Sequence, residues 1–177
     1  DAFALGSLSK AKAAIQNGSF DNEVAPHTMQ TRKGDVTVSI DEQPGNARPE
    51  KIPTLRAAFK KDGTITAANS SSISDGGAAL ILMSESKAKE QGLTPLCKIV
   101  AHSTHSQKPS EFTVAPVGAM NSVLEKAGWA VNDVDLWEIN EAFAMVTMLA
   151  INELKLDESK VNVNGGACAL GHPIGAS

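Results

Sequence analysis

Apolar positions along the chain follow helical and strand periods in alternation, with one irregular stretch between them. Near the beginning, apolar residues recur every three or four positions, which predicts an amphipathic helix that ends at Asn17 and Gly18. From residue 78 onward, the pattern predicts strand 78–83, helix 85–91, strand 97–101, helix 116–127, strand 136–139, helix 142–154 and strand 161–163. Strands that alternate with helices indicate a layered α/β architecture.

The segment from residue 19 to residue 69 has a different character. It is polar, it contains four prolines, and it has few periodic apolar residues. Within it, residues 35–40 alternate like a short exposed strand, and residues 55–59 are expected to form one or two helical turns. Long irregular segments in compact proteins are commonly binding loops or lids, so we expect this one to contact a ligand.

Composition and charge narrow the class of protein. Of the 177 residues, 42% are apolar and 20% are charged, which is typical of a globular protein. The formal net charge is −4 and basic residues cluster only in pairs, so nucleic-acid binding has no electrostatic footprint. The sequence shows neither an apolar run that could span a bilayer nor a signal-peptide pattern. We therefore expect a cytoplasmic protein without nucleic-acid or membrane partners.

The two cysteines, Cys97 and Cys168, lie in predicted apolar segments. This placement predicts buried, reduced thiols rather than a disulfide. Apolar surroundings raise the pKa of a thiol, so neither cysteine is expected to be a nucleophile. His102 and His105 lie near Cys97 in the sequence, but no second pair of ligands completes a tetrahedral set. The sequence therefore predicts no metal site.

Two corners of the predicted fold carry polar side chains that suggest chemistry. His172 stands between Gly171, which permits close approach of a ligand, and Pro173, which restricts the histidine to extended geometry. Such a corner suits a catalytic base, although an isolated histidine is more often structural. Asn140 follows the predicted strand 136–139. It is either the N-cap of the next helix or an amide that points into a ligand cleft.

Three motifs make the chain similar to a known family. Residues 140–144 read NEAFA, residues 165–177 read GGACALGHPIGAS, and residues 69–79 read NSSSISDGGAA. In this order they resemble the thiolase family, and within it the acetyl-CoA acetyltransferases. The resemblance implies a fold of two similar α/β halves stacked as five layers, of which this chain is expected to supply the loop domain and the start of the second half.

The resemblance also implies a division of the chain. Residues 1–18 correspond to the end of the N-terminal half and residues 19–72 to the coenzyme A-binding loop domain. Residues 73–177 correspond to the end of the N-terminal half and the start of the C-terminal half. Because family members are longer, the chain is expected to be a central fragment. Their nucleophilic cysteine is expected upstream and their proton-shuttling cysteine downstream, so the fragment alone is expected to be inactive.

Thiolases transfer acyl groups between coenzyme A thioesters through an acyl-cysteine, which requires a thiolate, a base and donors to the oxyanion. By resemblance, His172 is the base and later a donor to the thioester oxygen. Asn140 holds a water that supplies the second donor. The expected reaction is condensation of two acetyl-CoA to acetoacetyl-CoA and coenzyme A, or its thiolytic reverse, with no cofactor beyond the thioester substrates. Family members are dimers or tetramers, so a homo-oligomer is expected.

Other residues are expected to contact coenzyme A or the acyl chain. Ser71 matches a serine of the family that contacts the pantetheine arm, although a run of serines also suits a plain turn. Apolar walls for the pantetheine and the acyl chain are expected from Ala67, Phe59, Ala142 and Phe143. Phe143 is equally suited to an ordinary core position.

Phe112 precedes the predicted helix 116–127, where short-chain biosynthetic thiolases often carry a methionine-glycine pair. We therefore expect Phe112 to shape the acyl pocket. Glu141 is expected to be a helix-start anion or a hydrogen-bond partner. Two alternatives stay open: a thiolase for longer or branched 3-ketoacyl-CoA substrates of fatty-acid β-oxidation, and a thiolase-like protein that binds coenzyme A or lipid without catalysis. The presence of both Asn140 and His172 argues against the second.

Overall fold

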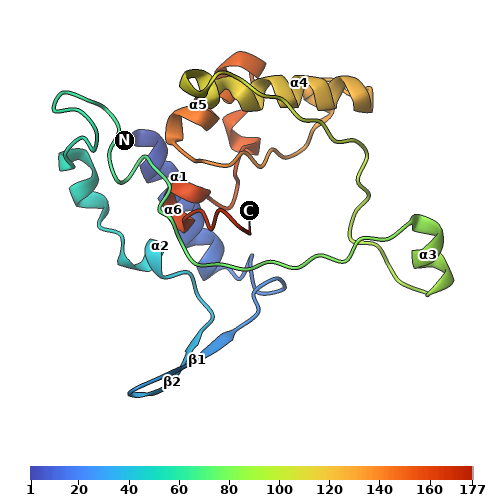
Figure 1. The fold of residues 1–177 in the computed structure, drawn as a ribbon, viewed down its shortest axis with the longest axis horizontal. Coiled ribbons are helices and arrows are strands. Elements are labelled where there is room, and N and C mark those ends of the chain that lie inside the picture. Colours follow the sequence, from blue (N-terminus) through green and yellow to red (C-terminus); the bar gives the residue numbers. More distant parts are fainter. Residues whose placement is uncertain (177) are drawn as a thin grey trace.

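The computed structural model describes residues 1–176 as helices, a β-hairpin and long irregular segments (Figure 1). The α-helices are α1 (Ala2–Gln16), α2 (Glu42–Asn46), α3 (Glu85–Glu90), α4 (Ala115–Ala127), α5 (Ala144–Leu154) and α6 (Ala167–Leu170). The strands are β1 (His27–Thr31) and β2 (Gly34–Val38). The 3-10 helices are η1 (Pro49–Thr54), η2 (Pro109–Val114), η3 (Val131–Asp133) and η4 (Glu158–Lys160).

Helix α1 forms where its apolar spacing predicts it and packs against α6, which is far away in the sequence (Figure 1). Its buried face carries Ala4, Ser7, Leu8, Ala11 and Ala14. The helix ends as predicted: Asn17 is the C-cap, and Gly18 follows with a φ of 77°. Left-handed backbone after a helix favours glycine because glycine has no Cβ to clash.

Two clusters of buried apolar side chains anchor the two candidate motifs. The first cluster joins α4, α5 and the segments around them through Leu124, Trp137, Ile139, Ala150, Leu154, Leu156 and Val161. The second joins α1, η1 and α6 through Leu8, Ala11, Ile52 and Ala169. Asn140 follows directly after Ile139 of the first cluster, and His172 lies three residues after Ala169 of the second. The backbone that carries each candidate side chain is therefore held in place by a nearby buried apolar cluster.

The predicted strands 136–139 and 161–163 lie side by side in parallel. They meet at a single isolated bridge between Trp137 and Val161. The backbone N–H of Trp137 donates to Lys160 at 2.8 Å, and the N–H of Asn162 donates back to Trp137 at 2.8 Å. The predicted positions are right, but the pairing is too short to be a sheet.

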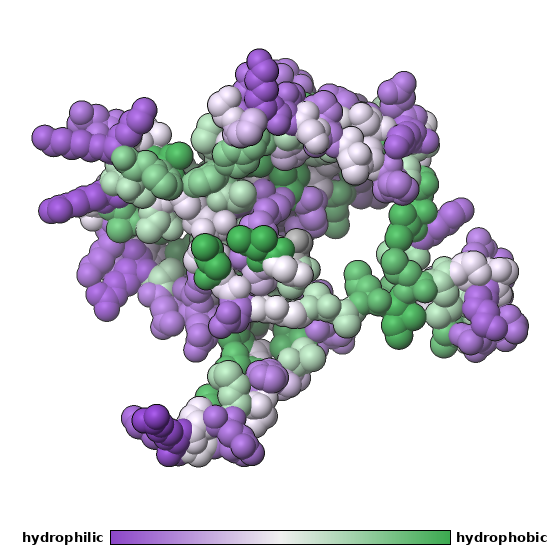
Figure 2. Space-filling model, viewed as in Figure 1, coloured by the Kyte–Doolittle hydropathy of each residue, from purple (hydrophilic) through white to green (hydrophobic). Residues whose placement is uncertain are grey.

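The strands predicted at 78–83 and 97–101 are wrong. Both segments are extended away from the body of the protein, on the way to α3 and back (Figure 1). A strand needs a neighbour to pair its N–H and C=O groups, and no other described segment pairs with either one. Their apolar side chains are exposed as a result: Leu80 is 85% exposed and Ile99 is 63% exposed. Figure 2 shows hydrophobic residues along this extension.

Strands β1 and β2 form a hairpin, which is the one sheet found among the described residues. Strand β2 covers most of the predicted strand 35–40 and pairs antiparallel with β1, from His27 opposite Val38 to Thr31 opposite Gly34. It is almost entirely exposed, as the alternating pattern indicated. In Figure 1 the hairpin projects from the body.

Three predicted helices are confirmed with small shifts. Helix α3 begins after Ser84, whose hydroxyl accepts a hydrogen bond from the N–H of Lys87. Helix α4 ends at Gly128, which has a φ of 70°. Helix α5 begins at Ala144, two residues later than predicted.

The remaining short helices depart from the expectation. Residues 55–59 are not helical, because the turn forms upstream in η1, which begins with Pro49, a favoured first position. Helices α2 and α6 were not predicted, since five and four residues are too few to show a helical period. None of the described helices is long and apolar enough to cross a bilayer. The division at residues 18 and 72 stays a prediction.

Gly165 is expected to be essential for the packing of α1. Its φ is 84°, and an added Cβ would lie 2.7 Å from the backbone N of Ala11 and the backbone O of Ser7. Gly165→Ala is therefore expected to lower the free energy of unfolding by about 2–3 kcal/mol. Urea denaturation of the intact wild-type and variant proteins measures this change in the free energy of unfolding.

The matched control is Gly6→Ala, inside α1, where an added Cβ meets nothing within 4 Å. Alanine in a helix interior is expected to stabilise by about 0.5–1 kcal/mol. Equal effects of the two substitutions would contradict the packing argument.

Candidate active site

A short loop joins the two candidate motifs. The serine loop, residues 69–74, runs beside residues 142–144 on one side and His172 on the other. The N–H of Ser71 donates to the carbonyl of Ala142 at 3.0 Å, and the N–H of Ala144 donates to Asn69 at 2.9 Å. The N–H of His172 donates to the carbonyl of Ser72 at 2.9 Å. The three sequence motifs, far apart in the chain, therefore form one continuous structure.

Asn140 and His172 meet in space. The amide Nδ2 of Asn140 lies 3.2 Å from Nδ1 of His172. An amide NH₂ can only donate, so Nδ1 accepts in this arrangement and the proton of a neutral ring sits on Nε2. Asn140 is exposed and His172 is half-buried, so both are open to a ligand.

The helix-cap interpretation of Asn140 is wrong. Helix α5 starts at Ala144, its N-cap is Phe143, and no side chain caps it. Asn140 lies three residues earlier, where its side chain reaches His172 instead. The alternative, an amide that points into a ligand cleft, stays a prediction, because Asn140 lines neither of the two cavities described below.

The backbone around His172 is held tightly. Gly171 has a φ of 90°, and a Cβ there would overlap the hydroxyl of Ser74. Gln43 of α2 donates from Nε2 to the hydroxyls of Ser72 and Ser74, which ties the serine loop to a third segment. Sequence reasoning missed Gln43, because a glutamine in a polar stretch carries no pattern of its own.

The other expected binding residues fall into two groups. Ser71, Ala142 and Phe143 lie together beside the Asn140–His172 pair, and the Ser71 hydroxyl donates to the carbonyl of Ala142 at 3.2 Å. The ring of Phe112 meets Phe143 edge to face, with centroids 6.0 Å apart.

Ala67 and Phe59 form the second group, on the loop that precedes the serine loop. Ala67 is exposed in a turn closed by Asn69, whose Oδ1 accepts from the N–H of Thr66 at 2.8 Å. Phe59 is 75% exposed. Of the six expected contact residues, the structure thus places Ser71, Ala142 and Phe143 at the pair and Phe112 against Phe143. The roles of all six in binding stay predictions.

Glu141 is almost completely buried beside the pair, with 1% of its surface exposed. It accepts hydrogen bonds from Ser7, Asn162 and the N–H of Cys168. Because α5 begins at Ala144, Glu141 is not a helix-start anion, and the hydrogen-bond expectation is confirmed. Sequence reasoning missed Asn162. Its position within the predicted strand 161–163 was a possible signal, because asparagine is uncommon in strands.

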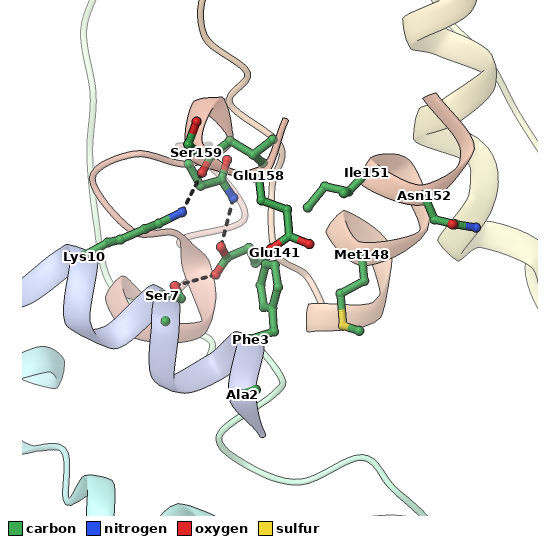
Figure 3. Close-up of a pocket in the computed structure, with 13 residues that line it drawn as sticks. Ala2, Phe3, Ser7, Lys10, Glu141, Met148, Ile151, Asn152, Glu158 and Ser159 are labelled. Atoms are coloured by element: carbon green, nitrogen blue, oxygen red, sulfur yellow. Dashed lines mark hydrogen bonds between the residues drawn. The ribbon is translucent and has the colours of Figure 1, made fainter. Parts of the chain in front are cut away.

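A cavity of about 620 Å³ opens on the side of Glu141 (Figure 3). Phe3, Ser7 and Lys10 of α1 form one wall, and Met148 and Ile151 of α5 form the opposite one. A smaller cavity of about 270 Å³ lies where the serine loop, at Ser74, meets residues 170–176. The smaller one therefore adjoins the backbone that carries His172.

The electrostatics of the site keep one cysteine inert. Burial and, after it, the neighbouring charge of Glu141 together raise the pKa of the Cys168 thiol to about 12. Burial and Glu141 also raise the pKa of Glu138. The prediction of an inert Cys168 thus agrees with its surroundings. The prediction of a buried Cys97 is wrong, because Cys97 lies in the unpaired segment 97–101 and is exposed.

No group of three or more histidine, cysteine, aspartate or glutamate side chains among residues 1–176 is arranged to hold a metal ion. The hydroxyl, amide and imidazole groups at the site suit hydrogen bonding to a ligand. The arrangement can therefore exchange protons and donate hydrogen bonds to an oxygen.

Comparison with known proteins identifies the family. The thiolase N-terminal domain model matches residues 1–86, and the thiolase C-terminal domain model matches residues 93–177. The chain belongs to the thiolase family. It is 48% identical over 177 residues to an acetyl-CoA acetyltransferase of Yarrowia lipolytica, covering all of this chain and 45% of that protein. This thiolase chain therefore spans less than half the length of that relative.

Solved structures agree on the thiolase α/β fold. The acetyl-CoA acetyltransferase of Bacillus anthracis superimposes with a TM-score of 0.95 at 46% identity, covering 99% of this chain and 45% of that one. The Acat5 thiolase of Ascaris suum, solved with coenzyme A, gives 0.93 at 44% identity, covering 100% and 45%. The backbone of this thiolase chain therefore follows that of these relatives over nearly its whole length.

Cys168 of this thiolase chain is expected to resist alkylation while the protein is folded. With a thiol pKa of about 12, about one thiol in ten thousand is ionised near pH 8, and the thiolate is the reactive form. Iodoacetamide labelling followed by peptide mass spectrometry is expected to modify Cys97 readily and Cys168 only after urea denaturation. Rapid labelling of Cys168 in the folded protein would contradict the assignment.

Proposed function

We propose that this chain supplies the histidine and asparagine of a thiolase active site in an enzyme that condenses two acetyl-CoA to acetoacetyl-CoA and coenzyme A, and runs the reverse thiolysis. The observation that carries the proposal is the contact of 3.2 Å between Asn140 Nδ2 and His172 Nδ1 on an open surface. Family membership and the acetyl-CoA acetyltransferase of Yarrowia lipolytica support the reaction and the substrate.

The amide of Asn140 suits both protonation states of the ring. Its Nδ2 donates to an unprotonated Nδ1, as in this structure, and its Oδ1 accepts from a protonated Nδ1 after rotation about the last side-chain bond. With the proton on Nδ1, the free Nε2 of His172 takes the proton of a cysteine thiol. The thiolate then attacks the thioester carbonyl, and the Nε2–H of the imidazolium donates to the oxyanion that forms.

The nucleophile in this proposal is a cysteine outside these residues. Cys168 has a raised thiol pKa, and Cys97 lies in the extension toward α3. The collapse of the tetrahedral intermediate expels coenzyme A thiolate, which takes a proton, and leaves an acyl-cysteine. A second cysteine, also outside these residues, takes a proton from the α-carbon of a second acetyl-CoA, and the resulting enolate attacks the acyl group. The C–S bond of the acyl-cysteine breaks, which releases acetoacetyl-CoA and returns the nucleophilic cysteine as its thiolate. The chemistry needs protein groups and the thioester substrates alone.

The same proposal includes a homo-oligomer, dimer or tetramer, for which family membership is the support. It also includes a cytoplasmic location, for which a composition typical of a globular protein is the support. A protein that binds coenzyme A without catalysis is disfavoured, because such a protein gains nothing from an asparagine aimed at an imidazole.

The experiment that tests the function is His172→Ala in the intact protein. Thiolysis of acetoacetyl-CoA is expected to lose about 10³-fold in kcat, because the base and an oxyanion donor are removed together. Absorbance of the enolate of acetoacetyl-CoA measures the rate, and circular dichroism checks the fold. The matched control is His102→Ala, an exposed histidine, which is expected to retain the wild-type rate. Full activity of His172→Ala would contradict its role, and an inactive wild-type protein would contradict the function.

Phe112 is expected to restrict the acyl pocket. Its half-exposed ring packs edge to face on Phe143, next to the serine loop. Phe112→Met replaces a rigid ring by a flexible chain. The ratio of kcat/KM for longer and 2-methyl-branched 3-ketoacyl-CoA substrates over acetoacetyl-CoA is expected to rise about tenfold. Trp129→Met, a half-exposed aromatic beyond α4, is the control. An unchanged ratio would remove Phe112 from the pocket.

A further inference from the structure

Glu141 is a buried carboxylate that forms no salt bridge with any residue that the structure describes. The salt bridges of residues 1–176 lie within α3, between Lys87 and Glu90 and between Lys89 and Glu85. A buried charge is costly unless hydrogen bonds compensate for it. At Glu141 this compensation comes from neutral donors: the Ser7 hydroxyl at 2.7 Å, the Asn162 amide at 2.9 Å and the Cys168 N–H at 3.1 Å.

These donors come from three separate parts of the chain. Ser7 lies in α1, Asn162 follows the bridged segment, and Cys168 lies in the first turn of α6. The Ser7 hydroxyl, while donating to Glu141, also accepts from the N–H of Gly166 at 3.0 Å. Figure 3 shows Ser7 reaching from α1 to the carboxylate. Glu141 therefore connects the segment of Asn140 to the turn that leads into His172.

Asn162 holds the residue on the other side of Asn140. Its Oδ1 accepts from the N–H of Ile139 at 2.8 Å, and its Nδ2 donates to the carbonyl of Ile139 at 2.8 Å. The same Nδ2 donates to Glu141. The backbone is thus held immediately before and immediately after Asn140, while the side chain of Asn140 stays exposed.

The turn before α6 is shaped to the carboxylate. A Cβ on Gly166 would overlap the carboxylate of Glu141, so the glycine allows the backbone to approach it. Two residues later, the N–H of Cys168 donates to that carboxylate, and α6 leads on to Gly171 and His172. Any displacement of the Glu141 carboxylate would therefore shift the N-terminal turn of α6.

We propose that Glu141 is a positioning residue that sets the distance between Asn140 and His172 by anchoring both of their backbone supports to one buried carboxylate. The proposal rests on the proposed function for its effect on catalysis. Its geometric content does not depend on which reaction the pair performs.

The test is Glu141→Gln in the intact protein. The substitution keeps the shape but turns one oxygen into an NH₂ group. Whichever way the amide lies, a donor then faces a donor, either Asn162 or the N–H of Cys168. We expect kcat for acetoacetyl-CoA thiolysis to fall at least tenfold with KM changed by less than twofold. The matched control, Glu138→Gln, changes an exposed carboxylate three residues earlier and is expected to leave both constants within twofold.

A double-mutant cycle separates positioning from general structural damage. If Glu141 acts through the pair, Glu141→Gln lowers kcat by less than threefold in an Asn140→Ala background. The reason is that the contact between Asn140 and His172, which Glu141 would position, is already absent there. The same tenfold loss in both backgrounds would overturn the proposal. If Glu141→Gln does not fold, Ser7→Ala removes one donor and is expected to give a smaller loss in kcat with the same dependence on Asn140.

A structural measurement distinguishes failure of this proposal from failure of the proposed function. Crystal structures of wild type and Glu141→Gln give the separation of Asn140 Nδ2 and His172 Nδ1 without any assay. We expect hydrogen-bonding distance in the wild type and more than about 3.5 Å in the variant. An unchanged distance in the variant would overturn the proposal even in an active enzyme. A lengthened distance in a protein without thiolase activity would uphold it and refute the function.

Discussion

Backbone hydrogen bonds from the serine loop are the interaction on which the site depends. Carbonyl groups of the loop accept hydrogen bonds from the N–H groups of Ala144 and His172, and the N–H of Ser71 donates to the carbonyl of Ala142. Two motifs, residues 140–144 and 165–177, are thereby held on either side of one extended segment, although 20 residues separate them in the chain. Because these bonds use main-chain atoms, the side chains of Asn140 and His172 stay free to face a ligand.

Beneath that surface, the polar groups are buried and fully engaged. Buried side-chain nitrogen and oxygen atoms of residues 1–176 all have a hydrogen-bond partner. The carboxylate of Glu141 and the amide of Asn162 are the centre of this layer. A satisfied buried network of this kind favours one geometry, since any shift leaves a donor or acceptor without water to replace its partner. Rigidity of the exposed pair therefore derives from groups that no ligand touches.

Helices were predicted well where an apolar period had room to repeat. α1 and α4 were found close to their expected bounds, and their ends at Gly18 and Gly128 follow from the conformational freedom of glycine. Strands at 78–83 and 97–101 were wrong, because a strand is defined by a neighbour that sequence alternation does not supply. At the site, local chemistry made His172 and Asn140 candidates, and the structure brings their side chains into contact, while their roles stay predictions. The roles of Asn162, Ser7 and Gln43 were missed, because each acts only on residues distant in the chain.

The sequence by itself determined the family and the two candidate residues, since the motifs around Asn140 and His172 are contiguous and each holds its own local corner. Only the tertiary structure decided that Asn140 is not a helix cap, that it contacts His172, and that Glu141 connects their supports. The physical reason is that capping, pairing and charge burial depend on which distant segments approach one another. That approach is set by packing of the two apolar clusters and not by any one stretch of residues.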